Sequence, residues 1–151
     1  MDNKEYFFNR AFEEAYKSFE LGEIPVGAVI VKDGKIISTG YNEKETHNCC
    51  LSHAELTAIR KASEVLNNWR LIDCDIYVTL EPCEMCAAAI KQARISNIYS
   101  AVSNDDENIH NNVLNILKKD KSNPQVNIYN DQCVEQGRKI LKDFFISTRN
   151  N

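Results

Sequence analysis

Two short clusters in this 151-residue chain contain residue types that could carry out chemistry. The first is H-A-E at positions 53–55, and the second is P-C-E-M-C at positions 82–86. Cys83 and Cys86 are three positions apart, so on a helix both sulfurs project from one face, and a helix N-terminus favours the thiolate that binds metal. His53 can supply a third ligand. Three protein ligands leave a tetrahedral zinc ion with one open position, which a water molecule fills.

An open position separates a catalytic zinc ion from a structural one. Zinc lowers the pKa of a bound water to about 7, so hydroxide becomes available near neutral pH. Glu55 is two residues from His53, and we predict that it takes a proton from this water rather than binding the metal. The pattern H-x-E followed by P-C-x-x-C is the signature of the zinc deaminases, in which the glutamate is the general acid and base. The sequence therefore indicates a hydrolytic deaminase with one zinc ion per subunit.

The cysteines also allow other interpretations. A lone C-x-x-C could be a redox pair or half of a structural zinc site. A closed structural zinc would need a fourth protein ligand, for which Cys49, Cys50 and Cys74 are candidates. Otherwise we expect Cys74 and Cys133 to pack as small hydrophobic residues, and Cys49 and Cys50 to line the wall near the histidine. A zinc-binding module without activity is thus the alternative from another class, although a structural zinc has no use for Glu55.

Hydrophobic periodicity predicts the elements that must position these residues. The expected helices are 3–21, 52–66, 82–93, 113–118 and 132–148. The expected strands are 26–31, 36–41, 75–80, 97–102 and 125–129. A hairpin followed by alternating helices and strands predicts an α/β fold, a three-layer α/β/α sandwich around a five-stranded mixed sheet. Both motifs would then begin helices that follow a loop or a strand end, where active sites of open sheets usually lie.

Composition is that of one ordinary domain spanning residues 1–151, with 43% hydrophobic and 26% charged residues. The polar N-terminus lacks the apolar core of a signal peptide, and no apolar run approaches the roughly 20 residues of a membrane span. We therefore expect a cytoplasmic protein with reduced cysteines and no membrane partner. The net charge of −4 argues against broad, salt-driven adhesion to nucleic acid, and we expect no DNA partner.

Several stretches resemble the bacterial tRNA-specific adenosine deaminases, which convert the wobble adenosine of an anticodon to inosine. They are E-I-P-V-G-A-V-I-V at 23–31, the H-A-E helix, N-W-R-L-I-D-C-D-I-Y-V-T-L-E-P-C-E-M-C-A-A-A-I at 68–90, and D-F-F at 143–145 followed by Arg149. The most specific parts are the V-T-L-E-P-C-x-M-C run and the D-F-F ending. The resemblance implies a cytidine deaminase-like fold, a tRNA anticodon stem-loop as substrate, and a homodimer in which the neighbouring subunit completes the RNA surface.

The same resemblance implies roles for residues around the base. The side-chain amide of Asn42 hydrogen-bonds the flipped base, although a plain turn residue is the alternative. Ala54 offers its backbone N–H near the reacting atom, and Glu55 passes the proton of the attacking water to the ring nitrogen and then to the departing ammonia. The positions that match the walls of the base pocket are Ile24, Pro25, Val26 and Leu80. For the valine-like positions in this set, the alternative interpretation is that the side chains simply pack in the hydrophobic core.

Residues 103–112 depart from the family, which usually carries a basic, glycine-containing segment ending in G-S-L here. In this chain the segment is S-N-D-D-E-N-I-H-N-N, which is acidic and lacks glycine, so it cannot bind phosphates in the same way. This departure favours the other enzymatic reading, a free-base or nucleotide deaminase of the guanine or cytosine type with the same zinc site.

A basic stripe on the last predicted helix partly compensates for the acidic segment. Arg138, Lys142 and Arg149 fall within one narrow stripe and are a possible RNA contact, with a solvated helix face as the alternative. The apolar face expected beside this stripe consists of Val134, Leu141, Phe145 and Thr148.

Overall fold

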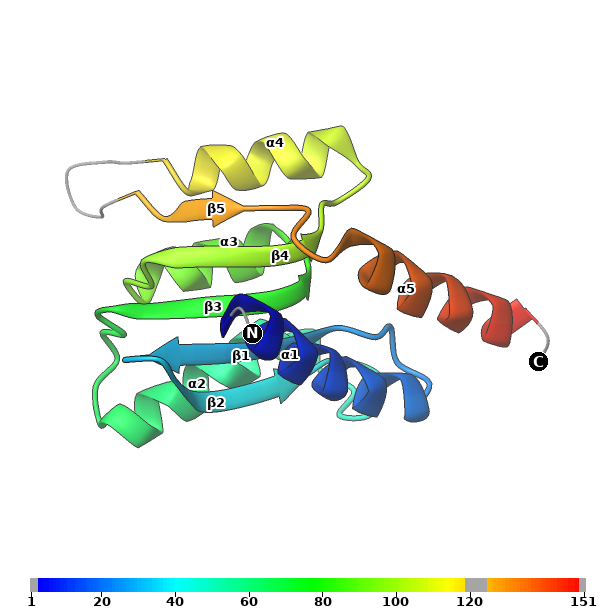
Figure 1. Ribbon diagram of the computed structural model, residues 1–151, viewed down its shortest axis with the longest axis horizontal. Helices are drawn as coiled ribbons and strands as arrows, with labels where there is room; N and C mark the ends of the chain where they lie inside the picture. Colours follow the sequence, from blue (N-terminus) through cyan, green and yellow to red (C-terminus); the bar gives the residue numbers. More distant parts are fainter. Residues whose placement is uncertain (1–2, 119–124, 150–151) are drawn as a thin grey trace.

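The structure is a computed structural model that describes residues 3–118 and 125–149. The elements in chain order are α1 (Asn3–Glu20), β1 (Gly27–Lys32), β2 (Lys35–Tyr41), α2 (Ala54–Leu66), β3 (Cys74–Leu80), α3 (Glu84–Gln92), β4 (Asn97–Val102), α4 (Glu107–Ile116), β5 (Asn127–Tyr129) and α5 (Val134–Arg149). The predicted α/β class, three layers and five-stranded mixed sheet are confirmed (Figure 1). Within these two ranges, no helix is both long and apolar enough to cross a membrane.

The sheet has the strand order β2-β1-β3-β4-β5. Strand β1 is antiparallel to both β2 and β3, whereas β3, β4 and β5 are parallel to one another. Asp33 and Gly34 both have positive φ and form the two-residue turn between β1 and β2, a geometry that glycine adopts without strain. Leu80 pairs with Val102 at the ends of β3 and β4. The loops that follow these two parallel strands therefore begin at the same edge of the sheet.

Two hydrophobic cores lie on opposite faces of the sheet. Residues of α2, α3 and α4 pack on one face, and residues of α1 and α5 pack on the other. Successive β1 residues alternate between them, since Ile30 belongs to the first core and Val29 and Val31 to the second. This explains why the strand is a continuous apolar run rather than an alternating one.

Helix α4 begins earlier than predicted, at Glu107 rather than near Val113. The carboxylate of Asp106 accepts hydrogen bonds from the backbone N–H groups of Asn108 and Ile109 and so caps the helix. Acidic residues at a helix N-terminus also interact favourably with the helix dipole. The prediction was wrong because these acidic residues read as a loop, although they form the cap and first turn.

The apolar face of α5 also differs from the predicted one. The buried positions are Gly137, Ile140 and Phe144, whereas the side chain of Phe145 is 48% exposed. A Cβ atom at Gly137 would lie 2.3 Å from Cγ2 of Val102, so the helix backbone approaches β4 directly at this glycine. Of the predicted face, Leu141 packs against the second core and Val134 is half-buried, whereas the prediction is wrong for Phe145 and Thr148, which are exposed. The buried face is shifted because hydrophobicity does not mark a contact made by a glycine.

Candidate active site

Three side chains that the sequence predicts as metal ligands come together in the structure. The Nδ1 atom of His53 lies 3.8 Å from Sγ of Cys83 and 3.6 Å from Sγ of Cys86. All three ligand atoms lie within 4.8 Å of one another. A tetrahedral zinc ion with bonds of about 2.0–2.3 Å separates nitrogen and sulfur ligands by roughly 3.6 Å. The donor types and their spacing therefore fit zinc, with Nδ1 as the histidine ligand.

Helix N-termini position two of these ligands. His53 is the N-cap of α2 and Cys83 is the N-cap of α3, and neither side chain makes a conventional capping hydrogen bond. A conventional cap stabilises a helix by about 1 kcal/mol, and here the side chain is left available for a metal instead. A Cβ atom at Gly40 of β2 would lie 2.3 Å from the carbonyl oxygen of Ala54. The bare glycine thus lets the first turn of α2 lie directly on the sheet.

The other cysteines do not join this group. Within residues 3–118 and 125–149, the only cluster of potential metal ligands is the histidine with Cys83 and Cys86. Cys74 is buried at the start of β3 in the first core, and Cys133 packs against the second core, as predicted. No fourth protein ligand therefore closes the site in the part of the chain that the structure describes.

Cys49 and Cys50 are exposed on the loop between β2 and α2 and are not part of the cavity wall, so the prediction that they line the wall near His53 is wrong.

The buried carboxylate of Glu23 holds the loop between β2 and α2, because it accepts hydrogen bonds from the backbone N–H of Glu45 and from the N–H and hydroxyl of Thr46. Burial raises the pKa of Glu23, but these hydrogen bonds outweigh it and lower the pKa overall. They fix the first half of the loop against the cavity and leave its second half on the surface.

Glu55 lies in the first turn of α2 and is only 3% exposed. Burial raises the pKa of its carboxyl group to about 7, and the charge of Cys83 contributes in the same direction, whereas a hydrogen bond from its own backbone N–H opposes the shift. A carboxyl group with a pKa near neutrality can both accept and release a proton at physiological pH. Glu55 has the properties of a proton carrier beside the ligands.

The pKa values of the two cysteine thiols are shifted in opposite directions. A hydrogen bond from the Cys86 thiol, helped by the backbone N–H groups of Cys86 and Met85, lowers the pKa of Cys83 to about 5 although burial opposes this. The hydrogen bond to Cys83 and burial both raise the pKa of Cys86. A thiolate is therefore favoured at the N-terminus of α3, where a cation would be attracted.

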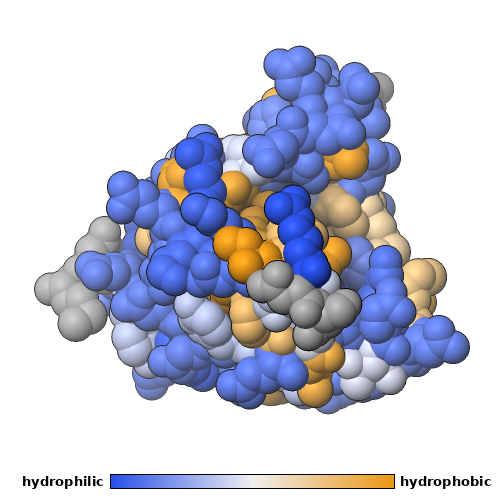
Figure 2. Space-filling view, turned by 90° about the vertical axis from the view of Figure 1, so that its right-hand side faces the viewer, coloured by the Kyte–Doolittle hydropathy of each residue, from blue (hydrophilic) through white to orange (hydrophobic). Residues whose placement is uncertain are grey.

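A cavity of about 380 Å³ opens beside these side chains, at the edge of the sheet where β3 and β4 end. Figure 2 looks onto this edge and shows apolar surface in the centre bordered by hydrophilic side chains. Five of the residues predicted to contact the base line the cavity, namely Ile24, Val26, Asn42, Ala54 and Leu80. Pro25 is buried and is not part of the lining.

Asn42 makes the turn contacts of the alternative interpretation and also faces the cavity. Its amide nitrogen donates to the carbonyl oxygen of Ile24 at 3.1 Å, and its amide oxygen accepts from the backbone N–H of Lys44 at 3.2 Å. These bonds tie together two chain segments that border the cavity. An amide nitrogen has two N–H groups, so a second donor remains for a ligand.

Other lining residues were missed by the sequence analysis. Asn104 lies in the acidic segment after β4, and Phe144 lies on the buried face of α5. The D-F-F motif contained a signal for Phe144, but the predicted register placed Phe145 on the buried face instead. Asn104 carries no pattern that would mark it, because only the parallel pairing of β3 with β4 places it at the cavity.

The fold and the site together define a hydrolytic deaminase of the cytidine deaminase-like class. A family model described as MafB19-like deaminase matches residues 1–149. The chain therefore belongs to the MafB19-like deaminase family, and within it to the group whose members are named tRNA-specific adenosine deaminase.

Individual relatives support this placement. The tRNA-specific adenosine deaminase of Aquifex aeolicus is 42% identical over 149 residues, which cover 98% of this chain and 97% of that protein. A solved structure from work on A-to-I editing by tRNA deaminases at the wobble position has a TM-score of 0.80 and 34% identity, covering 90% of this chain and 99% of that one. The guanine deaminase of Bacillus subtilis has a TM-score of 0.64 and 36% identity, covering 97% and 94%.

Proposed function

We propose that this chain is a single zinc-dependent deaminase domain that converts adenosine to inosine at the wobble position of a tRNA anticodon. The main support for this reaction is the buried carboxyl group of Glu55, which lies beside the three potential metal ligands at the wall of a cavity. The choice of substrate is supported by the Aquifex aeolicus relative, which shares nearly its whole length with this chain and is named tRNA-specific adenosine deaminase, and by the solved structure from work on wobble-position editing.

The reaction follows from the side chains around the cavity. His53, Cys83 and Cys86 would hold a zinc ion, which would supply a Lewis acid that makes water nucleophilic near neutral pH. Glu55 takes one proton from the attacking water and delivers it to the ring nitrogen, then takes the proton of the new hydroxyl group on carbon 6 and passes it to the exocyclic amine. The bond from carbon 6 of adenine to oxygen forms, the bond to the amine breaks, and ammonia leaves. Asn42 lines the cavity, and its second N–H would orient the base.

The cavity and the anticodon loop suit each other. A cavity of about 380 Å³ falls within the range of roughly 300–1,000 Å³ that is usual for small ligands, so it can admit one base. Deamination requires the base to leave its stack, and anticodon loops present bases that are already partly unstacked. A loop is therefore an easier substrate than a duplex.

The test is inosine formation on a tRNA whose anticodon begins with adenosine, measured beside free adenine, guanine, cytosine and their nucleosides. Inosine at that single position supports the proposal. Guanine deamination is the second candidate, favoured by the 36% identity to the Bacillus subtilis guanine deaminase. Turnover of free guanine without inosine in tRNA would contradict the tRNA assignment and support that candidate.

The basic stripe of Arg138, Lys142 and Arg149 is exposed on α5, the helix whose Phe144 lines the cavity. We propose that it contacts tRNA phosphates. Charge reversal by Arg138→Glu with Lys142→Glu is expected to weaken tRNA binding and to reduce the slope of log K against log[salt] by about 2, because each phosphate contact contributes about 0.9. Binding titrations at several salt concentrations measure this slope.

The matched control reverses Lys32 and Lys35, which flank the β1–β2 turn at the opposite end of the sheet from the cavity (Figure 1). This pair changes the net charge equally, so we expect a smaller effect on the salt slope. If both double variants bound tRNA with the same affinity and slope, α5 would be an ordinary solvated helix face.

We further propose a cytoplasmic homodimer. A tRNA substrate is consistent with the cytoplasm. Support for the dimer comes from large apolar side chains that are exposed around the end of α2 and the start of β3, namely Val65, Trp69 and Ile72. Light scattering on the zinc-loaded protein is expected to give about twice the chain mass of 17.3 kDa. A mass equal to one chain at micromolar concentration would contradict the dimer.

A further inference from the structure

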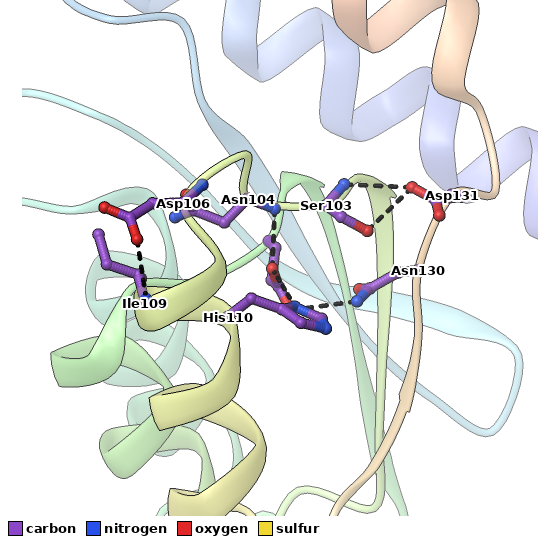
Figure 3. Close-up of polar contacts among 8 residues, drawn as sticks. Ser103, Asn104, Asp106, Ile109, His110, Asn130 and Asp131 are labelled. Carbon is purple, nitrogen blue, oxygen red and sulfur yellow. Dashed lines mark hydrogen bonds and ion pairs between the residues drawn. The ribbon is translucent and has the colours of Figure 1, made fainter.

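One buried carboxylate connects the acidic segment to the active site. Glu81 immediately follows β3, and its side chain is completely buried. Its Oε1 accepts hydrogen bonds from Nδ1 of His110 at 2.7 Å and from the amide of Asn130 at 3.1 Å. Its Oε2 accepts from the backbone N–H of Asn104 at 2.8 Å and from Nδ1 of His110 at 3.0 Å. In Figure 3, dashed lines run from Asn104, His110 and Asn130 to this carboxylate, which is drawn without a label.

The three donors come from three different parts of the chain. Asn104 lies in the loop after β4, His110 lies on α4, and Asn130 lies in the connection after β5. Because an ionised carboxylate only accepts hydrogen bonds, Nδ1 of His110 must carry the hydrogen in this arrangement. A second contact closes the group, since the backbone N–H and the hydroxyl of Ser103 both donate to Oδ1 of Asp131, at 3.3 and 2.9 Å (Figure 3).

These contacts join the cavity wall to the segment that carries a predicted metal ligand. Glu81 is two residues from the ligand Cys83, and its own backbone N–H donates to the carbonyl oxygen of Val102 at the end of β4. Asn104, which the carboxylate holds through its backbone, lines the cavity. The connection that contains Asn130 leads into α5, which carries the lining residue Phe144. One carboxylate, two residues before the ligand Cys83, thus contacts both the loop that contains Asn104 and the connection that leads into α5.

We propose that Glu81 and His110 are positioning residues for the substrate, holding Asn104 at the cavity and fixing the start of α5, the helix that carries the lining residue Phe144. The acidic segment therefore shapes the cavity through contacts within the protein instead of through contacts with phosphates. This inference rests on the proposed deaminase function, but not on which base is deaminated. His110 reaches the cavity only through Glu81 and Asn104, so its influence is on substrate binding and not on proton transfer.

The test compares four variants of the zinc-loaded protein, using the substrate that the wild-type protein turns over. His110→Ala removes one hydrogen-bond donor and frees the N-terminal part of α4. KM is therefore expected to rise roughly tenfold, which is about the change in affinity that the loss of one hydrogen bond produces. The value of kcat should change by less than about twofold, since the reacting groups are untouched. Asn111→Ala, at the next and exposed position of α4, is the matched control and should leave KM unchanged.

The conservative variant separates positioning from bulk stability. His110→Asn can place an amide N–H where Nδ1 lies and should restore a KM near that of the wild type. His110→Gln places its amide nearer the position of Nε2 and should not. This pair also serves if His110→Ala does not fold.

Two results would overturn the inference. One is a lower melting temperature in His110→Ala or His110→Gln with an unchanged KM, which means that the contact only stabilises the fold. The other is a fall in kcat at constant KM. Failure of the wild type to deaminate tRNA would instead count against the proposed substrate, because the comparison of KM and kcat would then be made on the free base that it does deaminate.

Discussion

Glu55→Ala is expected to lower kcat by roughly 10²–10⁴-fold, the usual contribution of a positioned general acid or base, while zinc remains bound at one ion per subunit. The carboxyl of Glu55 lies beside the ligand group but is not a member of it. Its removal therefore takes away the proton carrier and leaves all three ligands. Inosine release under saturating substrate gives kcat, and elemental analysis of the purified variant gives the zinc content.

The control for this variant is Glu64→Ala, on the exposed side of the same helix, which should retain full activity and zinc. Wild-type turnover in Glu55→Ala would remove this residue from the mechanism. Loss of zinc together with activity would show that Glu55 is needed to hold the metal, a role that its position outside the ligand group does not predict.

Cys86→Ala is expected to reduce bound zinc from about one ion per subunit to near zero and to abolish turnover. Two remaining ligands cannot hold zinc against buffer as three can. The variant should also melt at a lower temperature, because a ligand at about 1,000 times its dissociation constant stabilises the folded state by about 4 kcal/mol and this contribution disappears. A chelator added to the wild type should reproduce both the loss of activity and the lower melting temperature.

Cys74→Ala provides the matched comparison, since Cys74 and Cys86 are both fully buried and only Cys86 belongs to the ligand group. Removing the Cys74 thiol creates a small cavity in the core and should lower stability modestly, with zinc and activity retained. If Cys86→Ala kept stoichiometric zinc, the ligand set inferred from the geometry would be incorrect.

Local sequence patterns were sufficient for most of the fold. The strands of the sheet are apolar runs bounded by turn residues, and α1 and α2 have strong helical periodicity, so their existence and type followed directly. The two errors have one kind of cause. The start of α4 depends on capping by Asp106, and the buried face of α5 depends on backbone contact at Gly137. Neither feature contributes to hydrophobic periodicity.

In the candidate site, too, local sequence patterns predicted some residues and not others. His53, Glu55, Cys83 and Cys86 could be predicted because short spacings place each pair at the start of one helix. The contact of Asn104 with the cavity could not, since it arises from the parallel pairing of β3 and β4. The contacts among residues of the loop after β4, α4 and the connection after β5 likewise require the tertiary structure.

The cavity is built by three stretches of the chain, of which the first contributes Ile24, Val26 and Asn42 to the wall. The metal ligands and the proton carrier all lie between His53 and Cys86, whereas Asn104 and Phe144 join the wall from the part of the chain that follows β4. Mutations in the later stretch can therefore alter which base fits without disturbing the hydrolytic machinery. Substitutions before His53 or after β4 thus change the shape of the base pocket, while the residues between His53 and Cys86 stay as they are.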